Sequence, residues 1–124
     1  PFKSSMIKFS AYSNVDTTTL DTDNEVGNNN SGIENAYGYM TGFAQNYNGV
    51  TTQQVIYGGG SGNSINDISK YAAVDECIGL RYSNQNGDKL GLTTATIVSF
   101  DNNGFTINVT NSDDKVIVMY TAYR

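Results

Sequence analysis

The last third of the chain has the clearest pattern of apolar and polar positions. Segments 93–100, 105–110 and 115–124 are rich in β-branched and aromatic residues, and short polar runs of Asn, Asp and Gly separate them. Residues of the first kind pack well on a pleated strand, and those of the second kind suit tight turns. The pattern therefore predicts three consecutive β-strands joined by tight turns.

Earlier segments predict four further strands, at 5–13, 35–43, 53–57 and 77–83. The glycine-rich run 58–62 is predicted to be a turn, and Asn86 with Gly87 is the dipeptide of a tight hairpin.

A helical turn is credible only within 64–75, where Ile65, Ile68 and Ala72 have helical spacing, and an irregular crossover is the alternative there. The count of seven or eight short strands predicts an all-β fold in a single domain, 1–124. An antiparallel β-sandwich of jelly-roll or immunoglobulin-like type is expected, with a small barrel as the alternative.

Composition and charge narrow the classes of partner. Abundant Asn, Gly, Thr and Ser favour strands and turns over helices. The formal net charge is −5, with only 7 Lys and Arg residues, which argues against nucleic acid and against an anionic membrane surface. No apolar run approaches the roughly 20 residues of a membrane helix. No signal peptide is predicted, because the first residues already have the pattern of a strand.

The sequence contains few residues that could form a catalytic site. The chain has no His, which excludes imidazole-based triads and imidazole metal sites. Cys77 is the single cysteine, so no intrachain disulfide forms, and it is predicted to be a small buried apolar residue. Asp75 and Glu76 are neighbours on a predicted strand and point to opposite faces, so they do not flank one substrate bond. The sequence therefore predicts a protein that is not an enzyme and needs no cofactor.

One spacing resembles a metal site. Asp21, Asp23 and Glu25 alternate within the polar stretch 16–34, and their carboxylates converge on Ca²⁺ if the loop curls. The alternative is a plain polar loop, since the later positions do not match an EF-hand. Segment 21–31 is predicted to face outward or toward a partner.

The final strand is apolar on both faces. One face carries Val116, Val118, Tyr120 and Ala122, and the other carries Ile117, Met119 and Tyr123. An outer strand of an isolated sandwich has one wet face, so this strand is predicted to be covered by a loop or by another subunit. The residues expected in that burial or contact are Val116, Val118, Met119, Tyr120 and Tyr123.

The nine tyrosines admit two interpretations. Either their rings fill the core and their hydroxyls reach its rim, or they present aromatic faces beside Asn and Asp side chains, as in sugar-binding and protein-binding surfaces.

Residues 94–107, with the return strand that ends at Arg124, resemble the C-terminal hairpin of small sandwich domains in bacteriophage virion proteins. These are tail-fibre tips, head fibres and capsid decoration proteins. The resemblance implies a non-enzymatic structural protein on the virion surface, a homo-oligomer that contacts sister subunits and a major capsid or tail protein.

Two alternatives stay open. The same hairpin has a weaker similarity to H-type lectin domains, which implies a carbohydrate-binding, receptor-binding module that meets a host-surface glycan in the extracellular space. The third possibility is a secreted filament subunit that joins its neighbours by strand addition.

Overall fold

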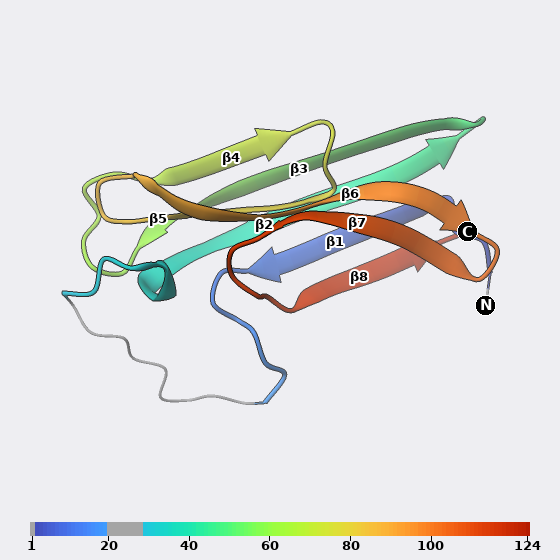
Figure 1. Ribbon diagram of the computed structural model, residues 1–124. Coiled ribbons are helices and arrows are strands. Elements are labelled where there is room, and N and C mark those ends of the chain that lie inside the picture. Colours follow the sequence, from blue (N-terminus) through green and yellow to red (C-terminus); the bar gives the residue numbers. More distant parts are fainter. Residues whose placement is uncertain (1, 20–28) are drawn as a thin grey trace.

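The computed structural model describes residues 2–19 and 29–124. This part of the chain contains one short 3-10 turn, Ile33–Asn35, and eight strands. The strands are β1 (Met6–Tyr12), β2 (Ala36–Tyr47), β3 (Val50–Ser61), β4 (Ser69–Ala73), β5 (Ile78–Ser83), β6 (Lys89–Asp101), β7 (Gly104–Ser112) and β8 (Val118–Tyr123). They form a five-stranded sheet in the order β4-β3-β2-β1-β8 and a three-stranded sheet in the order β5-β6-β7 (Figure 1). Every pairing is antiparallel, which confirms the predicted all-β antiparallel sandwich.

Several predicted elements are confirmed at the level of the local turn. β6 and β7 form the hairpin expected around the Asp-Asn-Asn-Gly turn, with Asp101 paired to Gly104. Gly87 has a φ of +78° in the tight turn between β5 and β6, a backbone conformation that favours glycine. The turn residues therefore predicted these two hairpins correctly.

Three predicted elements are wrong. Residues 58–60 continue β3 instead of forming a turn, because they pair with the first half of β2. No helix forms in 64–75. Ile65 and Ile68 are exposed instead of packing on the core, and β4 pairs with β3 at that place.

The last strand is the third correction, because β7 and β8 do not form a hairpin. Asp113 N–H donates to Leu92 O at 3.0 Å, and Ile117 N–H donates to Val15 O at 2.8 Å. The chain thus leaves the three-stranded sheet after Asp113 and crosses to the five-stranded sheet. There β8 pairs with β1, so the segment between β7 and β8 connects the two sheets at this side.

Small side chains on β2 let the two sheets pack closely. The inward positions of β2 include Gly38, Met40 and Gly42. A Cβ on Gly42 would lie 2.0 Å from the carbonyl oxygen of Cys77, and a Cβ on Gly38 would lie 2.2 Å from the Tyr57 hydroxyl. The chain that enters β5 therefore rests directly on the backbone of β2, and the aromatic residues of β2 face outward.

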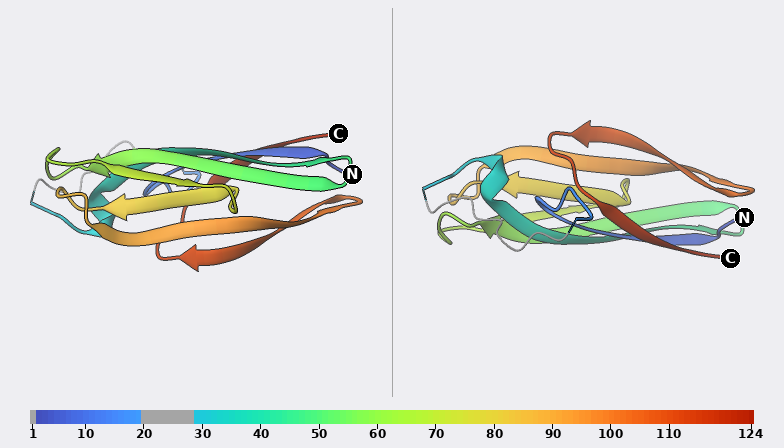
Figure 2. Two further views of the ribbon diagram at one scale, coloured as in Figure 1. Left: turned by 90° about the horizontal axis from the view of Figure 1, so that it is seen from above. Right: turned by 90° about the horizontal axis from the view of Figure 1, so that it is seen from below.

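The two sheets lie as stacked layers (Figure 2), and side-chain contacts join them at both sides and in the middle. On one side, Ser69 Oγ of β4 donates to Arg81 O of β5 at 2.6 Å. In the middle, the Gln53 amide of β3 bonds to β6. On the other side, the Phe105 ring of β7 contacts Phe9 and Tyr120, with centroids 5.7 and 5.1 Å apart.

Burial of Tyr82 gives the fold a sensitivity to alkali. Its ring is fully buried, its hydroxyl bonds to Thr93 Oγ1 at 2.7 Å, and desolvation raises its pKa from 10.0 to about 12. Above pH 10 the unfolded chain loses this proton while the folded protein keeps it, so stability falls until the folded form also titrates near pH 12. We expect Tyr82→Phe to reduce this decline, measured as the free energy of unfolding in urea from about pH 9 to about pH 11.5. Equal slopes for the two proteins would contradict the prediction.

Candidate functional site

Cys77 and Tyr71 make contacts that support the fold. The Cys77 thiol is fully buried, and desolvation raises its pKa to about 11, so it stays protonated at neutral pH. Its Sγ donates to Ala95 O at 3.7 Å, and the predicted burial of this cysteine is confirmed. Nearby, the Tyr71 hydroxyl donates to a Glu76 carboxylate oxygen. Both contacts hold β4, β5 and β6 in place.

The calcium candidates Asp21, Asp23 and Glu25, and most of segment 21–31, lie outside the described residues. Within 2–19 and 29–124, no group of three or more His, Cys, Asp or Glu residues is placed to hold a metal ion.

Among those same residues, the structure has no helix with the length and apolar character needed to cross a membrane.

The predicted contact residues of the last strand divide into two groups. Val116 and Val118 are half-buried against the core. Met119, Tyr120 and Tyr123 are exposed, with 66%, 61% and 43% of their surface accessible. The core thus partly covers the face of Val116 and Val118, while the described chain leaves Met119 and Tyr123 on the other face exposed.

The strand β8 is also an open edge of the five-stranded sheet. Ser13 N–H donates to Gly38 O and Asn46 N–H donates to Ser5 O, so the odd-numbered residues of β1 bond to β2 and the even-numbered ones to β8. In the register Ser10↔Met119, the N–H and C=O groups of Val118, Tyr120 and Ala122 then point away from β1. This row of backbone groups is named here the β8 edge.

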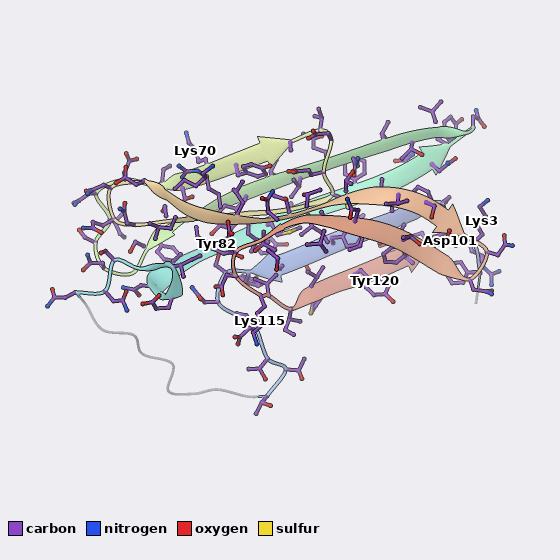
Figure 3. All side chains as sticks on the ribbon, in the orientation of Figure 1. Lys3, Lys70, Tyr82, Asp101, Lys115 and Tyr120 are labelled. Atoms are coloured by element: carbon purple, nitrogen blue, oxygen red, sulfur yellow. The ribbon has the colours of Figure 1, made fainter. Side chains whose placement is uncertain are left out.

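The second surface is the outer face of the five-stranded sheet, which we name the aromatic face. Its side chains alternate with the buried ones along each strand. They are Met6, Lys8, Ser10 and Tyr12 of β1, Tyr37, Tyr39, Thr41, Phe43, Gln45 and Tyr47 of β2, Thr52, Gln54 and Ile56 of β3, Lys70 and Ala72 of β4, and Met119, Thr121 and Tyr123 of β8. Lys70 and Tyr120 mark opposite sides of this sheet, on β4 and β8 (Figure 3).

Two adjoining hollows lie on the aromatic face. One, of about 340 Å³, has Lys8, Phe43 and Gln54 in its wall. The other, of about 540 Å³, has Tyr39 and Lys70 in its wall. Both contain Thr41 and Ile56, so together they form one groove that crosses β2 and β3 diagonally. Next to it, the rings of the paired residues Tyr12 and Tyr39 pack with centroids 4.8 Å apart and planes tilted by 42°.

The alternation of large and small residues along β2 indicates this face in the sequence. Tyr37, Tyr39 and Phe43 fall on one face of β2, and Gly38 and Gly42 on the other. Large apolar rings are normally the buried side of such a strand, but here the glycine side is buried. Of the nine tyrosines, Tyr57 and Tyr82 are in the core, and six are exposed: Tyr12, Tyr37, Tyr39, Tyr47, Tyr120 and Tyr123.

Comparison of the chain with protein-family models, with curated protein sequences and with solved structures finds no match. Function is therefore inferred from the β8 edge, the aromatic face and the residues of the C-terminal hairpin.

Proposed function

We propose that the chain is a non-enzymatic structural protein of a virion, of the capsid decoration or fibre-tip type, that assembles through its β8 edge. The observation that carries this proposal is an exposed edge strand without protection. Val118–Tyr123 contains no charged residue and no proline, and three of its side chains are large and accessible. Soluble sandwiches normally protect such an edge with lysine, proline or a bulge, because it pairs readily with another chain.

A second copy of the chain is suited to this edge. If two β8 strands pair antiparallel about Tyr120, Val118 lies opposite Ala122 of the other copy and Met119 lies opposite Thr121. Each pair matches a larger side chain with a smaller one, and no like charges meet within the strand. The two five-stranded sheets then join into one continuous sheet, and the exposed Met119 and Tyr120 are covered at the junction.

The virion setting rests on the resemblance of the β6–β7 hairpin and the last strand to phage sandwich domains. In such a particle the protein's work is contact and mechanical support. Sister copies meet at β8, and a capsid or tail protein holds the assembly on the particle. The low content of charged residues, 15%, suits a rigid body of this kind.

The solution mass tests assembly. We expect the wild-type protein to form a discrete oligomer of the 13.4 kDa chain at micromolar concentration. The double variant Met119→Lys/Tyr120→Lys is expected to be monomeric, because lysine on an edge strand opposes pairing. Light scattering after size exclusion gives the masses, and circular dichroism confirms that the variant keeps its fold.

Val98→Lys is the matched control. Val98 is 59% exposed on β6 in the other sheet, so a lysine there adds a positive charge to an exposed strand position but leaves the β8 edge intact. A monomeric wild type, or equal dissociation by Val98→Lys, would disprove assembly through β8. Open-ended polymers would favour the filament subunit instead. Co-sedimentation of the wild type with the source particles, lost in the double variant, tests the virion setting.

A further inference from the structure

The aromatic face differs in charge from the rest of the chain. The chain carries 12 Asp and Glu residues, but the outward side chains of β1–β4 and β8 include none of them. The charged residues among these outward positions are Lys8 and Lys70. A locally cationic face on an acidic protein attracts anionic partners.

The two lysines stand at the two ends of the groove. Lys8 lines one hollow and Lys70 the other, and Thr41 and Ile56 lie between them in both. Lys8 is on β1 and Lys70 on β4, three strand spacings or about 14 Å apart across the sheet. In the register, Lys8 is level with Gln54 and Lys70 with Gly58, four residues or about 13 Å along β3. A ligand that reaches both must be extended, as an oligosaccharide of several rings is.

Neither lysine is neutralised within the described chain. Lys8 Nζ lies 5.7 Å from the centroid of the Tyr123 ring, and no carboxylate among the described residues pairs with Lys8 or Lys70. Both ammonium groups are therefore available to bind a carboxylate, and a charge-assisted hydrogen bond of this kind is stronger than a neutral one.

The groove wall between the lysines suits sugar rings. Thr41 and Tyr39 carry hydroxyls and Gln54 carries an amide, and each of these groups both donates and accepts hydrogen bonds, as sugar hydroxyls require. The exposed ring of Tyr39 and the half-buried ring of Phe43 offer flat apolar surfaces for the C–H faces of a pyranose.

An extended peptide fits less well here. Both edges of β1 and β2 are paired, and β3 pairs with β4 from Val55 to Gly59, so the floor of the groove offers few free backbone groups with which a peptide could form a strand. From the charge, the spacing and the groove wall, we infer that the aromatic face binds an oligosaccharide that carries carboxylates. This site lies on the sheet face, beside the β8 edge and separate from the backbone groups that assembly uses.

Titration calorimetry with defined oligosaccharides tests the site. The acidic probes are oligogalacturonate and oligosialate, which separate uronic acid from sialic acid as the source of the carboxylates. Methyl-esterified oligogalacturonate is the neutral counterpart. We expect one acidic probe to bind, the neutral ester to bind at least about tenfold more weakly, and the affinity to fall as salt rises from about 50 mM to about 500 mM.

Variants locate the site. Lys8→Gln and Lys70→Gln are each expected to weaken binding about tenfold, while Lys89→Gln, at an exposed lysine on β6 in the other sheet, leaves it unchanged. Tyr39→Ala reports the contribution of the ring. No binding of either acidic probe at millimolar concentration would overturn the inference. Equal binding of the neutral ester, an equal loss with Lys89→Gln, or equal binding of oligoglutamate would overturn it too. A Tyr120→Lys variant, which changes a β8 side chain outside the aromatic face, must still bind, which separates this result from assembly.

Discussion

Replacing Gly42 by alanine is expected to destabilise the fold by about 3 kcal/mol, because a side chain has no room at this point of the sandwich. The added Cβ would lie 2.0 Å from the carbonyl oxygen of Cys77 and 3.1 Å from that of Gln54. Both oxygens belong to backbone, so neither rotates away as a flexible side chain does. Relief requires β2 and the chain entering β5 to separate, which opens the core around Leu80 and Met40.

Gly58→Ala is the matched control for Gly42→Ala. Gly58 lies on the neighbouring strand β3 and faces outward, and no heavy atom lies within 4 Å of the position its Cβ would take. We expect a change within about 0.5 kcal/mol, or slight stabilisation from the reduced freedom of the unfolded chain. Urea denaturation of the three proteins measures both effects. Similar stabilities for Gly42→Ala and Gly58→Ala would show that the sheets are packed less closely than the structure indicates.

The same glycine explains where sequence reasoning succeeded and where it stopped. Alternation along β2 shows two different faces, one with Tyr37, Tyr39 and Phe43 and one with small residues. Which face is buried depends on the contact between Gly42 and Cys77, which are 35 positions apart, and periodicity holds no information about such a contact. Local turn chemistry, by contrast, is complete within a few residues, so the β5–β6 and β6–β7 turns were predictable.

The pairing partner of β8 could not be predicted from the sequence for a similar reason. The composition of β8 identifies a strand, but its pairing with β1 depends on the crossing between Asp113 and Ile117. A strand pattern is equally compatible with a hairpin to β7. The helical spacing of Ile65 and Ile68 wrongly predicted a helical turn. Both side chains are exposed, so their spacing reflects no packing.

The sequence identified one of the two candidate surfaces, the last strand, and not the aromatic face. The apolar last strand indicated an unsatisfied contact surface, and Met119, Tyr120 and Tyr123 are indeed exposed there. The aromatic face requires the register of five strands, since Lys8 and Lys70 are 62 positions apart and meet one groove only after folding. A surface built from strands distant in sequence is in general invisible until the pairing is known.

Gln53 supplies the second large effect, because it joins the two sheets through one side chain. Its Nε2 donates to Thr96 Oγ1 at 2.9 Å, and its Oε1 accepts from Ile97 N–H at 2.9 Å. Both partners belong to β6, while Gln53 is on β3 and pairs with Ala44 of β2. Gln53→Ala removes both bonds and leaves the backbone N–H of Ile97 without its acceptor. We expect a loss of about 2 kcal/mol in the free energy of unfolding.

Two variants separate the amide from packing and from position. Gln54→Ala changes the adjacent residue, which is exposed on the aromatic face, and is expected to alter stability by less than about 0.5 kcal/mol. Gln53→Met keeps the length of the side chain but has no amide, so it should destabilise nearly as much as Gln53→Ala. If Gln53→Met is as stable as wild type in urea denaturation, then packing volume at this position, and not the pair of hydrogen bonds, holds β3 to β6.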